Sequence, residues 1–372
     1  MSTPASGVWF APGRANLMGE HTDYNEGLVL PFALSQGVTA TVTRRDDGLL
    51  AMRSKQMPGD EIITVGVDGL RPASVQGWAA YPAGVAWALR AADVPVAGAT
   101  IEIDSDLPVG AGVSSSAALE CAVALGLCEV SGIAMSRRVL AAVARQAENE
   151  FVGAPTGIID QHASLLCQAG HAMLLDCATR DITQVPFCPS AAGVSSLVID
   201  TCVPHSLADG AYARRRAQCE EAARQLEVPF LGQITDPADA GRLEDPKLRR
   251  RARHVVSDSA RARAIATALA EEDGADVYRD IGDLLTAGHA SLRDDFEVSW
   301  TQADVTVETA IDAGAYGAKM IGGGFGGSVL ALVPTGAIAD VRAAVTRTFT
   351  ERSWTPPAFM EAVPSPAARR IA

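Results

Sequence analysis

The chain has 372 residues, of which 48% are hydrophobic and 20% charged, and its formal net charge is −13. This length and composition predict a folded globular protein with two domains of ordinary size, neither disordered nor fibrous. The acidic balance argues against nucleic acid or an anionic membrane as the main partner, since both need a basic face. An anionic ligand would therefore have to bind at a local source of positive charge, such as an arginine, a helix N-terminus or a metal ion.

The N-terminal residues MSTPASGVWFAPG lack the basic start and the apolar run of a signal peptide. No segment offers the uninterrupted run of about eighteen apolar residues that a membrane-spanning helix requires. The seven cysteines are scattered and include no C-x-x-C pair, so reduced thiols are expected rather than a zinc site or a disulfide framework. We therefore expect a cytoplasmic protein with no membrane partner.

The first part of the chain is expected to be rich in strands, because short apolar or alternating segments are bounded by Gly, Asp or Pro. These segments are residues 28–34, 37–44, 49–54, 61–67 and 99–107, and one helix near residues 78–92 interrupts them. After Pro108 the pattern changes, and apolar residues at helical spacing predict helices over residues 114–130, 136–151 and 158–168.

Strands and helices are also mixed in the second part of the chain. Strands are expected at residues 171–177 and 195–201, followed by an arginine-rich helical region from about residue 205 to 291. A glycine-rich turn, a strand at residues 328–334, a helix at residues 338–349 and a short strand near Phe359 close the chain. This mixture predicts an α+β or α/β protein with a domain at residues 1–190 and another at residues 191–372.

Residues 13–25, GRANLMGEHTDYN, gather a guanidinium, carboxylates, an imidazole and a phenol between two β-like runs. Folding alone does not call for so many polar groups in one short segment. We call this the signature segment, and its composition indicates a binding site.

The run LPVGAGVSSSAALE gives the strongest local signal. Gly110 and Gly112 permit left-handed backbone, so that main-chain amides can crowd around a ligand. Ser114, Ser115 and Ser116 are natural N-cap residues for a helix expected to begin at Ala117. Amides, hydroxyls and a helix dipole favour an anion, most often phosphate, although a simple capped turn is the structural alternative. No Gly-Lys-Ser/Thr follows, so this is not a Walker loop. We call residues 110–116 the serine loop.

A second glycine run, KMIGGGFGGSVLALV, formally matches G-x-G-x-x-G. A dinucleotide site needs a strand before the glycines and a helix after them. Here a strand is expected to follow and none to precede, and no acidic residue stands at the ribose position. The run therefore does not predict a nucleotide fingerprint. It predicts either a flexible loop whose backbone can approach a bound ligand closely or a tight turn into a buried strand, and the two are compatible. We call residues 322–327 the glycine turn.

Two carboxylates, Glu148 and Asp160, lie on either side of residues 153–157, which we call the Pro/Gly loop. Asp160 either caps a helix or is a general base aimed into a cleft, for which Asp suits a sugar hydroxyl. Glu148 is either a solvated helix residue or a metal ligand paired with a serine hydroxyl. Mg²⁺ prefers hard oxygen ligands, with few supplied by the protein.

Together these segments resemble one family. The signature segment resembles the galactokinase signature, and LPVGAGVSSSAA and KMIGGGFGGS resemble motifs shared by galactokinase, homoserine, mevalonate and phosphomevalonate (GHMP) kinases. AENEFVGAPTGIIDQ, HSLADGAYARRRAQCEEA, RARHVV and SLRDDFEVS extend the resemblance over nearly the whole chain. It implies an α+β, two-domain GHMP-kinase-like architecture, with the active site in the cleft between the domains.

The resemblance also implies residue roles for phosphoryl transfer from ATP to the anomeric hydroxyl of α-D-galactose. Asp160 would be the base and Arg14 would stabilise the transition state. The implied sugar contacts are Glu20, His21, Asp23, Gly157 and Tyr212. The implied ATP contacts are Gly110, Ala111, Gly112, Val113, Ser114, Ser115 and Ser116, with Trp78 and Tyr81 as an adenine-facing aromatic pair. Core packing is an equal alternative for the two aromatic residues. Mg²⁺ would be held by Ser116 and Glu148.

The chain departs from the family pattern at few positions, namely Ala15, Met18, Val113, Thr156, Ile159 and Ser328. Thr156 and Ile159 flank the implied sugar contacts and could adjust specificity. Two alternatives stay open: a kinase for a related sugar such as N-acetylgalactosamine, and a non-catalytic sensor that binds ATP and galactose. A monomer is expected, with an oligomer left open.

Overall fold

The structure is a computed structural model that describes residues 5–59, 61–108, 110–204, 210–272 and 274–372. The strands are β1 (Ser6–Asn16), β2 (Leu28–Val29), β3 (Pro31–Arg44), β4 (Leu49–Ser54), β5 (Ile63–Gly66), β6 (Ala99–Ser105), β7 (His171–Asp176), β8 (Ile182–Pro186), β9 (Val194–Asp200), β10 (Gly317–Ile321), β11 (Ser328–Pro334), β12 (Ala358–Glu361) and β13 (Arg369–Arg370). The α-helices are α1 (Ala80–Ala91), α2 (Ser115–Val130), α3 (Arg137–Gln146), α4 (Ile159–Leu166), α5 (Ala211–Gln225), α6 (Pro246–Glu271), α7 (Ala275–Ser291), α8 (Thr301–Asp312) and α9 (Ile338–Glu351).

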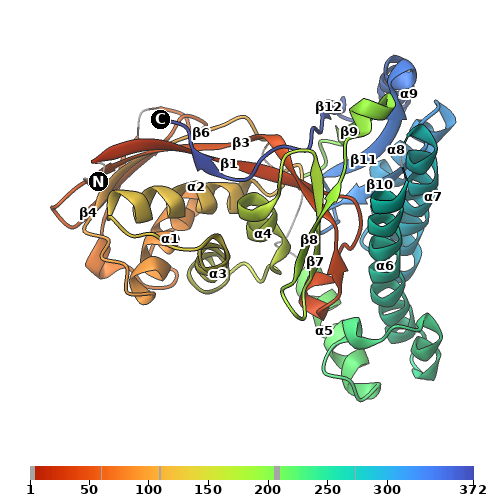
Figure 1. The fold of residues 1–372 in the computed structure, drawn as a ribbon, viewed down its shortest axis with the longest axis horizontal. Coiled ribbons are helices and arrows are strands. Elements are labelled where there is room, and N and C mark those ends of the chain that lie inside the picture. Colours follow the sequence, from red (N-terminus) through yellow and green to blue (C-terminus); the bar gives the residue numbers. More distant parts are fainter. Residues whose placement is uncertain (1–4, 60, 109, 205–209, 273) are drawn as a thin grey trace.

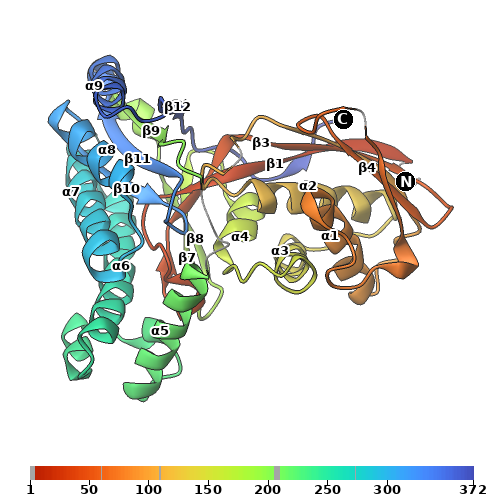
Figure 2. The same ribbon diagram turned by 180° about the vertical axis from the view of Figure 1, so that it is seen from behind.

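One end of the molecule is a sheet covered on one face by helices. Its strand order is β13-β1-β3-β6-β4-β5, and α1, α2 and α3 lie on the same side of it in both ribbon views (Figures 1 and 2). The helix α2 is buried along almost its whole length. A Cβ added at Gly126 would lie 2.5 Å from a methyl carbon of Val42, so the helix approaches the sheet closely there. This packing fixes the N-terminus of α2 relative to β1.

The other end is built around a second sheet. Its order is β10-β11-β9-β12, all antiparallel, and α6, α7 and α8 lie beside it at the far end from α1–α3 (Figures 1 and 2). The small sheet β2-β7-β8 lies between the two ends, and α6 packs on it. The chain finally returns to its start, since β13 pairs with β1 at Trp9 and Phe10.

The two ends share part of one apolar core. The largest cluster of buried hydrophobic residues joins the first sheet and α2 to residues of α6, α7 and β10, including Ile265, Ile281 and Ile321. A second cluster lies within the C-terminal part, between the helices α5, α6, α8 and α9 and the strands β9–β11. Because the ends are packed together in this way, loops from both can meet at one site.

The predicted α+β class is confirmed, and most of the predicted elements are present. Residues 28–34 and 37–44, expected as separate strands, belong mainly to the continuous β3. The strand β8 and the helix α8 were not predicted. Residues 205–209, where the expected helical region begins, lie outside the described residues. Within the described ranges, no helix combines the length and the apolar content needed to cross a membrane.

Two local expectations are wrong. A strand, β10, does precede the glycine turn, which therefore joins two antiparallel strands, β10 and β11. The fully buried Lys319 in β10 obscures its apolar character. The helix α2 begins at Ser115 rather than Ala117, and Ser114 at its N-terminus has left-handed backbone (φ +59°) with no side-chain capping bond. An ordinary N-cap residue has extended backbone, so the serine loop is shaped for something other than self-capping.

Candidate active site

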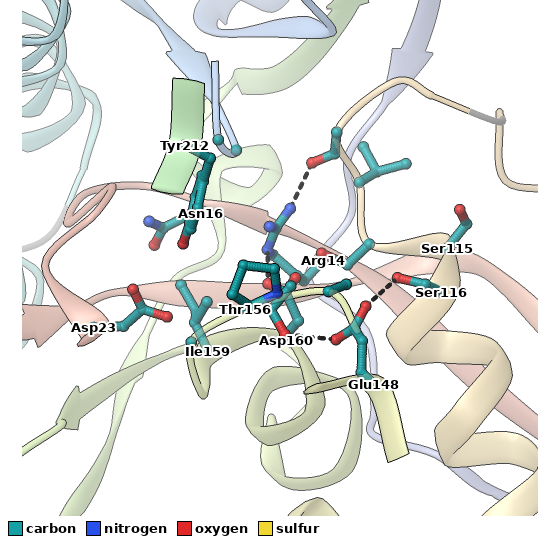
Figure 3. A pocket seen from close by; sticks show the side chains of 18 of the residues that line it. Arg14, Asn16, Asp23, Ser115, Ser116, Glu148, Thr156, Ile159, Asp160 and Tyr212 are labelled. Atoms are coloured by element: carbon teal, nitrogen blue, oxygen red, sulfur yellow. Dashed lines mark hydrogen bonds and ion pairs between the residues drawn. The ribbon is translucent and has the colours of Figure 1, made fainter. Parts of the chain in front are cut away.

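A cavity of about 440 Å³ lies where the predicted motifs meet (Figure 3). It is lined by the signature segment, the serine loop, the loop before α4, the start of α5 and the glycine turn. The lining residues are Arg14, Asn16, Gly19, Glu20, His21, Asp23, Tyr81, Gly110, Gly112, Val113, Ser114, Ser115, Ser116, Glu148, Val152, Gly153, Ala154, Pro155, Thr156, Gly157, Ile159, Asp160, Tyr212, Gly322 and Gly323. We call it the central cavity.

Arg14 and Asp160 form an ion pair in the middle of the central cavity. Arg14 Nε donates to Asp160 Oδ1 at 2.8 Å, and Arg14 Nη1 donates to the Gly112 carbonyl at 2.6 Å (Figure 3). A register shift between Pro12 and Arg14 interrupts the β1–β3 pairing, and such a bulge re-aims the side chain that follows it. Among the described residues no donor reaches Asp160 Oδ2, so this oxygen can accept a proton or a hydroxyl from a ligand.

The serine loop forms one end of the cavity. Gly110, Gly112 and Ser114 all have positive φ, which turns the chain sharply at the N-terminus of α2. The Ser114 hydroxyl is buried and has no hydrogen-bond partner among the described residues. Positive φ is uncommon outside glycine and, with an unsatisfied buried hydroxyl, is typical of a site that a ligand completes. The positive end of the α2 dipole makes an anion the favoured ligand here.

Glu148 lies beside this helix end on a wide π-helical turn, Ala147–Val152, that continues α3. Its Oε1 accepts from Ser116 Oγ at 2.9 Å, and its Oε2 accepts from Thr156 Oγ1 at 2.8 Å and Gln161 Nε2 at 2.7 Å. Burial raises the pKa of Glu148, and the charge of Asp160 adds to this rise. Glu148 is therefore a buried carboxylate in a dense network rather than a solvated helix residue.

Glu20 and Asp23 also line the cavity, and both are buried. In Figure 3, Asp23 lies on the side of Arg14 and Asp160 that faces away from Ser116. Asp23 Oδ2 accepts from the Ile158 amide at 3.1 Å, and its Oδ1 accepts from the Tyr24 amide at 2.9 Å. Burial raises the pKa of Asp23, with a further rise from the charge of Asp160. Gly157 is required at its position, because an added Cβ would lie 1.6 Å from Asp23 Oδ2.

His21 has its ring held from two sides. Its Nε2 lies 3.1 Å from the Gly323 carbonyl oxygen, which can only accept, so Nε2 carries a proton and donates. In the neutral ring Nδ1 then accepts from Tyr24 Oη at 2.9 Å. The ring packs on Tyr212 and Phe296, with centroids 5.1 and 4.7 Å away. The backbone of His21 also has positive φ (+63°), a strained conformation that the surrounding contacts maintain.

The structure brings together all the predicted site residues except two. Trp78 is not among the residues that line the central cavity and packs against the core, whereas Tyr81 lines it. Ala111 is fully buried, and its carbonyl accepts from Ser328 Oγ at 2.7 Å, which ties the serine loop to β11. The glycine turn, for which a close backbone approach to a ligand was one expectation, contributes Gly322 and Gly323 to the lining. The sequence reasoning did not single out Asn16 as a lining residue. Asn16 lies within the signature segment, so its position there was the available signal.

Comparison with known proteins identifies the family. A model described as the galactokinase galactose-binding signature matches residues 1–44, and models of the GHMP kinase N-terminal and C-terminal domains match residues 80–168 and 265–351. A galactokinase from Streptomyces coelicolor is 45% identical over 98% of this chain and 94% of its own length. The chain belongs to the galactokinase family. A Mycobacterium tuberculosis galactokinase is 42% identical over 96% of this chain and 97% of its own.

A solved structure supports the same assignment. Lactococcus lactis galactokinase complexed with galactose is 30% identical and superposes with a TM-score of 0.93, covering 100% of this chain and 96% of its own. The mevalonate kinase of Methanococcus jannaschii is 15% identical with a TM-score of 0.64, covering 98% of each chain, and so shares the fold. The predicted family and GHMP-kinase architecture are confirmed, and the chain is a sugar kinase of this family.

Proposed function

We propose that the chain transfers the γ-phosphoryl group of ATP to the anomeric hydroxyl of α-D-galactose, giving galactose 1-phosphate and ADP. The carrying observation is the Arg14–Asp160 pair at 2.8 Å, located between a buried polar end and a helix N-terminus. A sugar bound at the Glu20–Asp23 end and phosphates bound at the serine loop would meet at this pair. The name and ligand of the Lactococcus lactis structure favour galactose as the sugar.

In this proposal Asp160 takes the proton of the reacting hydroxyl. Its Oδ1 is held by Arg14, so its Oδ2 is oriented as the acceptor. Arg14 donates to Asp160 and Gly112 through Nε and Nη1, while among the described residues Nη2 has no acceptor, which leaves it for the transferring phosphoryl group. Positioning supplies much of the rate, because a loose phosphoryl transition state needs little covalent help.

The residues around Glu148 fit Mg²⁺. The Glu148 carboxylate and the Ser116 hydroxyl are hard oxygen donors 2.9 Å apart, beside the predicted phosphate end. No group of three or more His, Cys, Asp or Glu side chains suited to a metal occurs among the described residues, so the protein would supply few ligands. That suits an ion whose remaining ligands are phosphates and waters. An Mg²⁺ ion held by Glu148 and Ser116 would supply positive charge that offsets the negative charge of the transferring phosphates.

The test is ADP release by the purified protein with Mg-ATP and, in parallel, galactose, N-acetylgalactosamine, glucose, mannose and mevalonate. Turnover selective for galactose is expected. Selective turnover of N-acetylgalactosamine would keep the mechanism and replace the substrate. No turnover on any compound, with ATP and galactose still bound by calorimetry, would favour a sensor and overturn the proposal.

A further inference from the structure

Lys319 is a fully buried cation directly behind the central cavity. It lies in the middle of β10, its side chain has 0% exposure, and it is not one of the residues that line the cavity. Its Nζ lies 2.9 Å from Glu20 Oε2 and 3.2 Å from the Asn16 carbonyl oxygen. A buried ammonium group is costly unless an acceptor compensates it. Its partner, Glu20, belongs to the wall of the cavity.

Glu20 is held by donors from both halves of the chain. Its Oε2 accepts from Lys319 and from Asn16 Nδ2 at 2.6 Å, and its Oε1 accepts from the Gly322 amide at 3.1 Å. A carboxylate offers about four acceptor positions, so these donors leave about one, on Oε1, for a ligand hydroxyl. Glu20, Asn16 and Gly322 all line the cavity, and Lys319 contacts the first two. One buried cation therefore organises the wall where the signature segment meets the glycine turn.

The charge of Lys319 also opposes the effect of burial on Glu20. Burial raises the pKa of the Glu20 carboxyl, the nearby Asp258 adds to the rise, and Lys319 lowers it through its charge and its hydrogen bond. Asp258 is itself paired with Arg261 at 2.9 Å and accepts from the backbone amides of Gly19 and Glu20. Among the residues that the structure describes, Lys319 is thus the cation that contacts the Glu20 carboxylate itself.

We propose that Lys319 is a positioning residue for the sugar, which holds the Glu20 carboxylate in place as an acceptor for a sugar hydroxyl. This inference rests on the proposed function of the same cavity. It differs from a purely structural ion pair in one respect: Lys319 acts on sugar binding through Glu20. Loss of Lys319 should then affect galactose and not ATP, and only while Glu20 is present.

The experiment compares Lys319→Met, Lys319→Arg, Glu20→Gln and the double variant Lys319→Met/Glu20→Gln. For each we would measure the KM for galactose, the KM for ATP, kcat and the free energy of unfolding. Lys319→Met should raise the galactose KM by at least about tenfold, the usual scale for a lost bond to a buried charge. The KM for ATP should change by less than about twofold, and Lys319→Arg should restore most of the galactose affinity.

The double variant distinguishes a residue that positions Glu20 for the sugar from one that only stabilises the fold. If Lys319 acts through Glu20, adding Lys319→Met to Glu20→Gln should not raise the galactose KM further, while the neutral pair should recover stability lost in Lys319→Met. The inference would be overturned if Lys319→Met raised the galactose KM by the same factor with Glu20 and with Gln at position 20. Equal rises in the KM values for galactose and ATP would also overturn it. If Lys319→Met does not fold, Lys319→Gln, which loses the charge but keeps a hydrogen-bond donor, replaces it in both backgrounds.

Two controls complete the design. Lys55→Met removes a lysine whose ion pair with Asp104 is largely exposed, and it should leave both KM values unchanged. The unmodified chain separates this inference from the proposed function. If it does not turn over galactose, the proposed function fails, whereas galactose turnover with an unaltered KM in Lys319→Met defeats only the inference about Lys319.

Discussion

The two ends of the central cavity are built on different principles. At the end formed by Glu20, His21 and Asp23, polar side chains already have partners within the protein, including both oxygens of Glu20 and both ring nitrogens of His21. At the serine loop the backbone takes positive φ at three positions, and the Ser114 hydroxyl has no partner among the described residues. In Figure 3, Arg14 and Asp160 lie between Tyr212 on one side and Ser116 on the other.

This contrast fits the two ligands of the proposed reaction. A small rigid sugar is distinguished by hydroxyl positions, so its site benefits from side chains that folding has already fixed. Phosphates are recognised by charge and by backbone amides, so their site can stay incomplete until the ligand arrives. Substitutions at the two ends should therefore have separable effects on the sugar, the nucleotide and the metal ion.

The largest effect is expected at the junction of the two ends. Asp160→Ala should lower kcat by about a thousandfold, because it removes the proposed proton acceptor. ATP binding, measured by calorimetry, should persist. Asp160→Asn is the companion variant, since its amide oxygen can still accept from Arg14 but cannot take up the proton. Retention of most of the activity in either variant would remove Asp160 from the role of base.

The second largest loss of kcat is expected for substitution of Arg14. Arg14→Ala should lower kcat by about a hundredfold, a common cost for losing one donor to a developing negative charge. The KM for galactose should rise by a smaller factor than kcat falls, because Arg14 itself is not one of the proposed sugar contacts. Steady-state kinetics and sugar binding by calorimetry separate the two quantities. A pure loss of affinity, with kcat unchanged, would make Arg14 a binding residue.

The sugar end is tested most sharply at Gly157. Gly157→Ala places a methyl group 1.6 Å from Asp23 Oδ2, so Asp23 must move away from the Ile158 amide. The galactose KM should rise by about thirtyfold, with the ATP KM nearly unchanged. Gly66→Ala is the control, because nothing lies within 4 Å of the added carbon. Equal rises in the KM values for galactose and ATP would show that the two ends of the cavity do not act separately.

The phosphate end is tested at Ser116. Ser116→Ala removes a proposed metal ligand and the donor to Glu148 Oε1, but it keeps the backbone amides of the serine loop. The Mg²⁺ concentration for half-maximal activity should rise by about tenfold, while the galactose KM stays within about twofold. Ser131→Ala, at the other end of α2, is the control. An unaltered Mg²⁺ requirement would exclude the Ser116 hydroxyl as a ligand.

Much of this arrangement was accessible from the sequence, because the chemistry is concentrated in contiguous segments. The signature segment, the serine loop and the Pro/Gly loop each place their functional residues within a few positions, so the resemblance could be transferred residue by residue. The structure then brings these segments together around one cavity.

The contacts that support the site were not accessible in the same way. Lys319 donates to the carbonyl of a residue 303 positions earlier, and a lone lysine in a short segment gives no hint that it is buried. Its charge also concealed the strand β10. The serine loop misled differently, since three serines suggest a capped helix, whereas Ser114 has left-handed backbone and makes no cap. In both cases tertiary contacts override the local preference.

The smallest effect is expected behind the phosphate end, at Glu120 on α2. Its side chain is fully buried, with Oε2 accepting from Gln161 Nε2 at 3.1 Å and Oε1 without a partner among the described residues. Burial raises the pKa of Glu120 well above its ordinary 4.5, and the charge of Glu148 adds to the rise. Since the folded state binds this proton more tightly, its contribution to stability is lost as pH rises from 4.5 toward the raised folded pKa.

Glutamine does not titrate, so Glu120→Gln should become more favourable, relative to the unmodified chain, as pH increases. We expect the free energy of unfolding to gain about 1 kcal/mol more at pH 8 than at pH 5, measured by urea denaturation without nucleotide or Mg²⁺. Glu129→Gln on the same helix, at a side chain 39% exposed, should change stability by less than about 0.5 kcal/mol. Parallel pH profiles for Glu120→Gln and the unmodified chain would mean that folding does not alter the proton affinity of Glu120. Burial of the Glu120 carboxylate would then not lower the free energy of unfolding at high pH, although its fully buried position predicts that it should.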